Sequence, residues 1–213
     1  MIFLDEQNKS ILQKIFIIVC LSSAFVIAAF INKYPVYIHQ TLLIVCELIY
    51  ILRLGLTFFL FSKRRLVWLE TLTIAIIMSF ILFILIYIGK VNPKHFILND
   101  ILGIFIYFLG SFINTYSEYL RYNWKSNPKN RGHIYRCGLF KYSMHINYFG
   151  DVLLFFGFSI LTGRYWTLII PIGMLLNFMI FIIPSLDSYL SQKYGDEFVD
   201  YSRNTKKLIP FIY

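Results

Sequence analysis

Cysteine and histidine are scarce in this chain, and neither is spaced for metal binding or disulfide pairing. The 213 residues include three cysteines, Cys20, Cys46 and Cys137, and no two of them form a C-x-x-C pair. The four histidines are scattered along the chain. Disulfide frameworks and metal sites are recognised by closely spaced cysteines and histidines, so the sequence predicts neither.

Three further absences narrow the class of protein. No glycines have the G-x-G-x-x-G spacing and no strands are predicted, so a dinucleotide would have to be held by side chains. Asp5 and Glu6 follow Met1 where a signal peptide would carry basic residues, so we expect the first apolar segment to remain as an anchor. No internal repeat is visible, which argues against a transporter.

Charged residues are also few, at 15% of the chain, whereas hydrophobic residues make up 58%. Several stretches of about 18–20 residues carry almost no charge, and a helix of that length crosses the roughly 30 Å of bilayer hydrocarbon. We therefore predict an all-α fold, a polytopic membrane helical bundle with about six transmembrane helices. The expected spans are Ile11–Ile31, Thr41–Phe61, Glu70–Gly89, Phe96–Ile113, Phe149–Leu161 and Tyr165–Ile183. The fourth is expected to continue as a helix to about Tyr119.

The basic residues indicate how the spans are oriented. Lysines and arginines cluster after the second, fourth and sixth spans, while the other connections hold only Lys33, Lys90, Lys94 and Arg164. The clustered residues are Lys63, Arg64, Arg65, Arg121, Lys125, Lys129, Arg131, Arg136, Lys141, Lys193, Arg203, Lys206 and Lys207. By the positive-inside rule both termini are predicted to be cytoplasmic. The same rule accounts for the net charge of +9 without a nucleic-acid partner.

Polar residues concentrate between Asn114 and Asp151, in a segment too polar for a lipid-facing surface and too aromatic for an ordinary linker. Asn114, Glu118 and Arg121 share one helix face by their i, i+4 and i+3 spacing. This segment therefore predicts the wall of a site. Glu47 and Arg53 lie inside the second span, where a charge is costly and usually faces a partner or a cavity.

One block of the polar segment carries a family resemblance. Gly138-Leu-Phe-Lys-Tyr-Ser-Met-His-Ile-Asn-Tyr-Phe-Gly-Asp151 resembles the signature of the steroid 5-alpha-reductase C-terminal-like superfamily, in its bacterial-type oxidoreductase branch. The closing stretch from Lys193 to Phe211 is similar to the end of that family, and the helix carrying Asn114 and Glu118 is similar to the helix that leads into its site. The resemblance covers about residues 100–213.

The resemblance implies a membrane-embedded enzyme, with a cofactor bound by the C-terminal helices and a lipidic substrate admitted from the bilayer. Two domains are expected, 1–97 on the lipid-substrate side and 98–213 around a cytoplasmic-facing cofactor site. The membrane would be the bacterial inner membrane or the endoplasmic reticulum. The reductase branch uses NADPH to reduce a carbon–carbon double bond conjugated to a ketone. A related branch, the isoprenylcysteine carboxyl methyltransferases, uses S-adenosylmethionine to methylate a carboxylate on a lipidated cysteine.

Candidate site residues follow from side-chain chemistry and from the resemblance together. Glu47 and Tyr148 are the catalytic candidates, as donors to the substrate carbonyl oxygen on which charge builds during reduction. Arginines suit phosphate contacts, and amides or carboxylates suit ribose and amide groups. The cofactor-binding candidates are Asn114, Glu118, Arg121, Arg131, Arg136, Tyr142, His145, Asn147, Asp151 and Tyr194.

Two alternatives to the reductase stay open at this level. Arg131, His145 and Asn147 would equally suit methyl transfer to a substrate carboxylate. The chain also departs from the family signature, with Met144 for the arginine before the histidine and Ile146 for the proline after it. These departures keep a non-catalytic membrane protein of the same fold as a further alternative.

Overall fold

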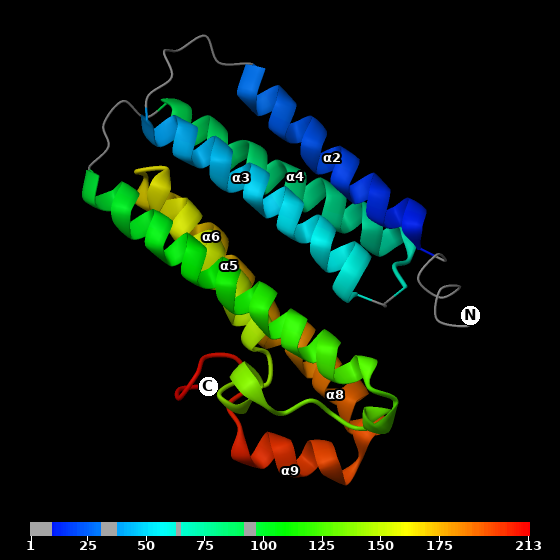
Figure 1. The fold of residues 1–213 in the computed structure, drawn as a ribbon. Helices are drawn as coiled ribbons and strands as arrows, with labels where there is room; N and C mark the ends of the chain where they lie inside the picture. Colours follow the sequence, from blue (N-terminus) through cyan, green and yellow to red (C-terminus); the bar gives the residue numbers. More distant parts are fainter. Residues whose placement is uncertain (1–9, 31–37, 63–64, 92–96) are drawn as a thin grey trace. The chain divides into compact units, whose positions relative to one another are not determined.

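The computed structural model describes residues 10–30, 38–62, 65–91 and 97–213, and all of its regular elements in these ranges are helices (Figure 1). An isolated bridge between Ser143 and Lys206 is the one β-type pairing in the described part. The chain divides into two compact units, 1–104 with 158–167 and 105–157 with 168–213. Residues used above that lie outside the described ranges are Met1, Asp5, Glu6, Ile31, Lys33, Lys63, Arg64, Lys94 and Phe96.

The first unit is built on three helices that pack against one another. These are α2 (Ile11–Phe30), α3 (Ile38–Leu56) and α4 (Trp68–Val91), with a π-helical turn, η1 (Thr57–Phe61), continuing α3. Lys14 on α2 is buried, and its ammonium donates to the carbonyl oxygens of Phe58 at 2.7 Å and Ser62 at 3.0 Å. A cation there satisfies carbonyls at a helix C-terminus that have no partner within the helix.

The second unit contains the signature block. Helix α5 (Ile97–Ser126) runs into it, followed by short 3-10 turns at η2 (Pro128–Asn130) and η3 (Gly138–Lys141) and then by α6 (Ile146–Leu161). After η4 (Tyr165–Leu168), α7 (Ile169–Asn177), η5 (Phe178–Ile182) and α8 (Ile183–Tyr194) form one continuous helical run. The amphipathic α9 (Asp196–Asn204) buries Phe198 and Tyr201.

A π-helical turn, η5, interrupts this last long run directly before Pro184. Proline has no amide hydrogen to donate to the preceding turn, so the regular ladder of hydrogen bonds cannot pass through it. A wider turn at this place changes the angular position of every residue that follows on α8. Asp187, three residues after Pro184, is one of them.

The membrane-spanning character predicted from the sequence is supported, and the protein is an integral membrane protein. In the described ranges five helical segments are long and apolar enough to cross a bilayer: Ile11–Ala28, Gln40–Phe61, Trp68–Gly89, Ile97–Ser126 and Tyr165–Tyr194. The fifth expected span, Phe149–Leu161, falls in α6, which has 16 residues and is shorter than these five segments. The helix at the fourth span continues to Ser126 instead of about Tyr119. The number of crossings and their orientation stay predictions.

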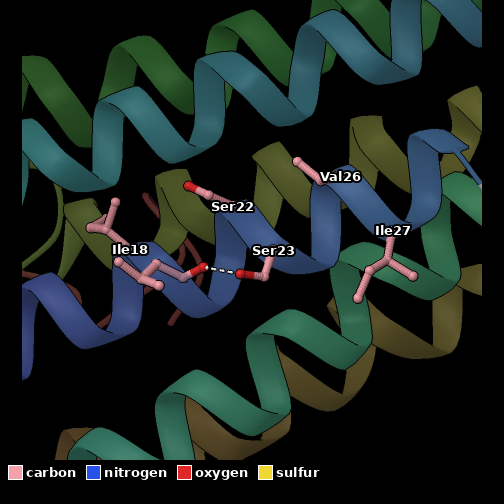
Figure 2. A pocket seen from close by; sticks show the side chains of 6 residues that line it. Ile18, Ser22, Ser23, Val26 and Ile27 are labelled. Atoms are coloured by element: carbon pink, nitrogen blue, oxygen red, sulfur yellow. Dashed lines mark hydrogen bonds between the residues drawn. The ribbon is translucent and has the colours of Figure 1, made fainter.

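A shallow hollow lies along the outer face of α2 in the first unit (Figure 2). Its volume is about 390 Å³, and its lining comes from Ile18, Val19, Ser22, Ser23, Val26 and Ile27. The Ser23 hydroxyl donates to the backbone oxygen of Val19 at 2.8 Å and so has its partner within the helix. This lining is apolar apart from two hydroxyls, as expected of a surface that faces lipid.

Candidate functional site

The site in the second unit begins with a close crossing of α5 and α6. Two glycines meet there, since a Cβ added to Gly150 would lie 2.6 Å from the Asn114 nitrogen and 2.8 Å from the Gly110 oxygen. Only glycine lets two helix backbones approach so closely. The crossing therefore brings Asn114 on α5 to the first turn of α6, and its side-chain Nδ2 donates to the Asn147 carbonyl at 2.9 Å.

A buried network of amides and charges extends from this crossing. Asn147 Nδ2 donates to Glu118 Oε1 at 2.9 Å, and the Arg121 guanidinium donates to both oxygens of Glu118. Asn114, Glu118 and Asn147 are each less than a tenth exposed. Asn114 Oδ1 is buried and accepts no hydrogen bond from the described residues. Buried polar atoms normally have partners, so the network holds one acceptor open for a donor.

The polar face of α5 continues beyond this network to a cationic cluster. Lys125 lies one turn past Arg121, and its Nζ is 3.3 Å from the Tyr194 hydroxyl. Lys193 donates to the Tyr189 hydroxyl at 3.1 Å, and its ammonium also lies 5.5 Å from the Tyr194 ring centre. The cytoplasmic-side ends predicted for α5 and α8 thus carry two ammonium groups around two phenols. Ammonium groups and hydroxyls together are suited to bind phosphate.

A second buried group lies at the loop before α6. His145 is almost wholly buried, and its Nε2 is 2.8 Å from Asp187 Oδ1 on α8. Lys207 Nζ lies 3.5 Å from the other oxygen of Asp187. The Tyr148 ring stacks on His145 at 5.9 Å between centres and on Phe178 at 4.8 Å. This arrangement fixes the imidazole between a carboxylate and an aromatic face.

The backbone carbonyls of residues 206–208 hold the same loop in place. The amides of Met144 and His145 donate to the carbonyl oxygens of Lys206 and Lys207, at 2.8 and 2.9 Å. The Ser143 hydroxyl is fully buried and donates toward the Leu208 oxygen at 2.8 Å. Position 144, where the family signature has arginine, packs in an apolar cluster with Ile134, Phe198 and Tyr201.

Helix α9 packs over the loop that precedes η3. The Tyr201 hydroxyl donates to the Phe140 oxygen at 2.5 Å, and burial raises the pKa of this phenol well above its usual value. Arg136 pairs with Asp200 at 2.8 Å, and His133 lies 3.3 Å from Glu197. These contacts fasten α9 to the loop.

The structure thus gathers some of the predicted site residues and separates others. Asn114, Glu118, Arg121 and Asn147 form one hydrogen-bonded network, while His145 and Tyr148 form the second group. Arg136 is engaged with α9, and Tyr142 is 40% exposed and packs against Phe211. Arg131 is exposed, and Asp151 lies one turn beyond Asn147 on α6. Their assignment to a cofactor stays a prediction.

Glu47 lies in the first unit, on α3. Its side chain is completely buried, and neither carboxylate oxygen has a hydrogen-bond partner among the described residues. Arg53 is also buried on α3, with its guanidinium 5.3 Å from the Tyr50 ring centre. The catalytic role of Glu47 stays a prediction from the sequence.

Three residues that the structure places in these groups are not among the predicted site residues. Asp187 lies 42 positions from His145, and no local sequence pattern connects the two. Lys125 and Lys193 contribute to the sequence predictions only through the positive-inside pattern. The i+4 spacing from Arg121 to Lys125 is a signal that could have identified Lys125 as part of the same face.

Comparisons with known proteins find a matching family and several distant relatives. A family described as a protein of unknown function, DUF1295, matches residues 61–205, more than half of the chain. The 3-oxo-5-alpha-steroid 4-dehydrogenase 1 of Rattus norvegicus is 30% identical over 116 residues, which are 52% of this chain and 40% of that protein. The 3-oxo-5-alpha-steroid 4-dehydrogenase 2 of Homo sapiens is 29% identical over 112 residues, 53% of this chain and 42% of that protein. The chain therefore matches less than half the length of these relatives.

Proposed function

This chain belongs to the DUF1295 family, within the steroid 5-alpha-reductase C-terminal-like group, and we propose that it is a membrane-embedded NADPH-dependent reductase. Its substrate would be a lipid or steroid-like molecule with a carbon–carbon double bond conjugated to a ketone. The proposal draws on the distant relationship to proteins named 3-oxo-5-alpha-steroid 4-dehydrogenase. It draws equally on the chemistry of the second unit.

The polar face of α5 is the observation that carries the proposal. Asn114, Glu118, Arg121 and Lys125 follow one another at helical spacing, from an open amide acceptor to a cationic cluster. Lys125 follows Asn114 by 11 positions on α5, which corresponds to a rise of about 16 Å along the helix. A ligand that fits this face is elongated, with a hydrogen-bond donor at one end and phosphate further along.

NADPH has both features, a hydrogen-bond donor at one end and phosphates further along, so the residues on this face fit it. Its carboxamide can donate to Asn114 Oδ1, and its phosphates can lie against Lys125, Lys193 and the Tyr194 hydroxyl. Glu118 holds Arg121 and Asn147 in fixed positions, so less freedom is lost when they bind a ligand. S-adenosylmethionine carries no phosphate and would leave the lysine cluster unused. The cationic cluster therefore favours the reductase over the methyltransferase alternative.

NADPH, when bound, supplies a hydride for the β-carbon of the conjugated system. The chain's own residues then have to stabilise the negative charge that develops on the substrate carbonyl oxygen and to supply a proton. Tyr148, held by stacking between His145 and Phe178, is proposed to donate a hydrogen bond to that oxygen. Glu47, on α3 in the first unit, stays a donor predicted from the sequence. A lipophilic substrate would reach such a site from the bilayer.

Binding of NADPH to the protein in lipid nanodiscs tests this proposal, with the fluorescence of the reduced nicotinamide as the signal. Lys125→Gln removes one proposed phosphate contact and should raise the dissociation constant by about 10-fold or more, since a charged hydrogen bond contributes roughly 1.5–3 kcal/mol. Lys129→Gln removes a neighbouring exposed lysine on η2 and serves as the matched control. Equal affinity in the two variants, or no binding by the unaltered protein, would overturn the cofactor assignment.

A further inference from the structure

A small apolar hairpin stands out on the surface of the second unit, at residues 208–213. Leu208 is completely buried and donates its amide to the Tyr213 oxygen at 2.7 Å, which closes the hairpin. Phe211 and Ile212 at its tip are 77% and 74% exposed. Two large apolar side chains are thus presented outward on a segment whose base is firmly attached.

The backbone of the hairpin is strained at its most exposed aromatic residue. Phe211 has a φ of +67°, and in the described residues it is the one non-glycine with a positive φ. A bulky side chain in this region costs free energy and persists only when its surroundings impose it. The hydrogen bonds from Ile212 and Tyr213 to the Ile209 oxygen impose it here, at 3.1 and 3.0 Å.

The hairpin lies at the start of α6, where a membrane boundary is expected. The carbonyl oxygens of residues 206–208 accept hydrogen bonds from Ser143, Met144 and His145, directly before α6 begins. The 16 residues of α6 rise about 24 Å, which is less than the roughly 30 Å of bilayer hydrocarbon. Apolar side chains beside the start of α6 can extend the apolar surface beyond the end of the helix and so make up this difference in length.

The residues around the hairpin suit a lipid headgroup region. Tyr142 is 40% exposed, and its ring packs against Phe211 at 5.7 Å between centres. The Lys141 ammonium lies 4.7 Å from the Tyr142 ring centre, and Lys206 and Lys207 flank the hairpin. Aromatic rings at the interface and lysines facing anionic headgroups are the usual composition of a membrane-surface contact.

From these observations we propose that the hairpin 208–213 is a membrane anchor that inserts Phe211 and Ile212 into the headgroup–acyl boundary of the bilayer. Its partner is the lipid surface on the side from which α6 starts. The carbonyl oxygens of Lys206 and Lys207 accept hydrogen bonds from the amides of Met144 and His145. The inserted hairpin would therefore also hold the His145 loop at the membrane surface. This role does not depend on which cofactor the protein binds.

Fluorescence quenching of a label at position 211 tests the anchor. Cys137 is exposed, so Cys137→Ser is introduced first, and this protein alone gives the background from Cys20 and Cys46. Phe211→Cys carries an environment-sensitive dye in vesicles of phosphatidylglycerol and phosphatidylcholine. Arg203→Cys, at an exposed position of α9, is the matched control.

Insertion predicts that a nitroxide high on the acyl chain quenches the dye at 211 at least about twofold more than the dye at 203, while iodide in the water does the reverse. Equal access of iodide to both positions would contradict the anchor. Ile212→Cys, with an ordinary φ, repeats the measurement if the variant at 211 does not fold. Strong quenching at 203 by the lipid nitroxide would also count against the proposal, since α9 would then lie equally deep.

Discussion

Met144 illustrates how single residues shape this site. The family signature has arginine at this position, but here the side chain is buried with Ile134, Phe198 and Tyr201. An apolar residue suits that environment because burying an unpaired guanidinium would be costly. Met144 thus contributes to the apolar packing under α9, next in sequence to His145, which pairs with Asp187.

Replacing Asp187 tests how much its pair with His145 contributes to the stability of the protein. Asp187→Ala leaves the His145 Nε2 without its partner in a nearly fully buried position, and this should lower the free energy of unfolding by about 1–3 kcal/mol. Ser185→Ala, on an exposed part of the same helix, should have little effect. Thermal unfolding of both variants in the same nanodiscs gives the comparison, and an unchanged midpoint for Asp187→Ala would show that the pair contributes nothing.

The buried phenol of Tyr201 should make the free energy of unfolding depend on pH in the alkaline range. Burial raises the pKa of its phenol in the folded protein, so folded chains keep the proton at a pH where unfolded chains lose it. Stability should therefore be unaffected by this group below about pH 10 and should fall above it. Tyr201→Phe should be less stable near neutrality, since the Phe140 oxygen loses its donor, but should show a shallower decline at alkaline pH. Parallel declines in both proteins would contradict this assignment.

At the scale of elements, the crossing of α5 and α6 determines where the buried network forms. Gly150→Ala places a methyl group against the Asn114 backbone, and overpacking of this kind costs about 1–3 kcal/mol or more. Gly173→Ala on α7 is the matched control, because a Cβ there meets no other atom within 4 Å. We expect a lower unfolding temperature and weaker NADPH binding for Gly150→Ala only. Similar behaviour of the two variants would mean that the close crossing is unimportant.

The sequence predicted the elements better than the contacts between them. Long apolar runs located the helices, and the i, i+4 spacing correctly put Asn114 and Glu118 on one face of α5. The pairing of His145 with Asp187 could not be read from the sequence, because it depends on the π-helical turn that sets the facing of α8. The engagement of Arg136 by Asp200 likewise depends on how α9 docks, which no local pattern encodes.

For the whole molecule, the three separated blocks of signature were the strongest sequence signal, and the family relationship that they predicted is confirmed by the match over residues 61–205. The match begins well before residue 100, so it also takes in α4, which the resemblance over about residues 100–213 does not include. The curated relatives are distant and match about half of the chain. The substrate, the cofactor and the orientation in the membrane are therefore proposals.

Native Cys137 allows the predicted orientation to be measured directly. It is exposed in the loop between α5 and α6, on the side where basic residues concentrate. The positive-inside rule predicts that this loop is cytoplasmic, so a membrane-impermeant maleimide should label Cys137 in inverted vesicles and not in right-side-out vesicles. Cys137→Ser gives the background from Cys20 and Cys46. Labelling from the opposite side would reverse the proposed orientation of the site.

The most direct test of the central claim compares the thermal stability of the protein with NADPH and with S-adenosylmethionine. A ligand at 100 times its dissociation constant stabilises the folded state by about 2.7 kcal/mol. A NADPH-dependent reductase should be stabilised by NADPH and not by S-adenosylmethionine. Stabilisation by S-adenosylmethionine alone would contradict the account and favour methyl transfer. No effect of either ligand on a folded sample would contradict it as well, and would favour a non-catalytic member of the family.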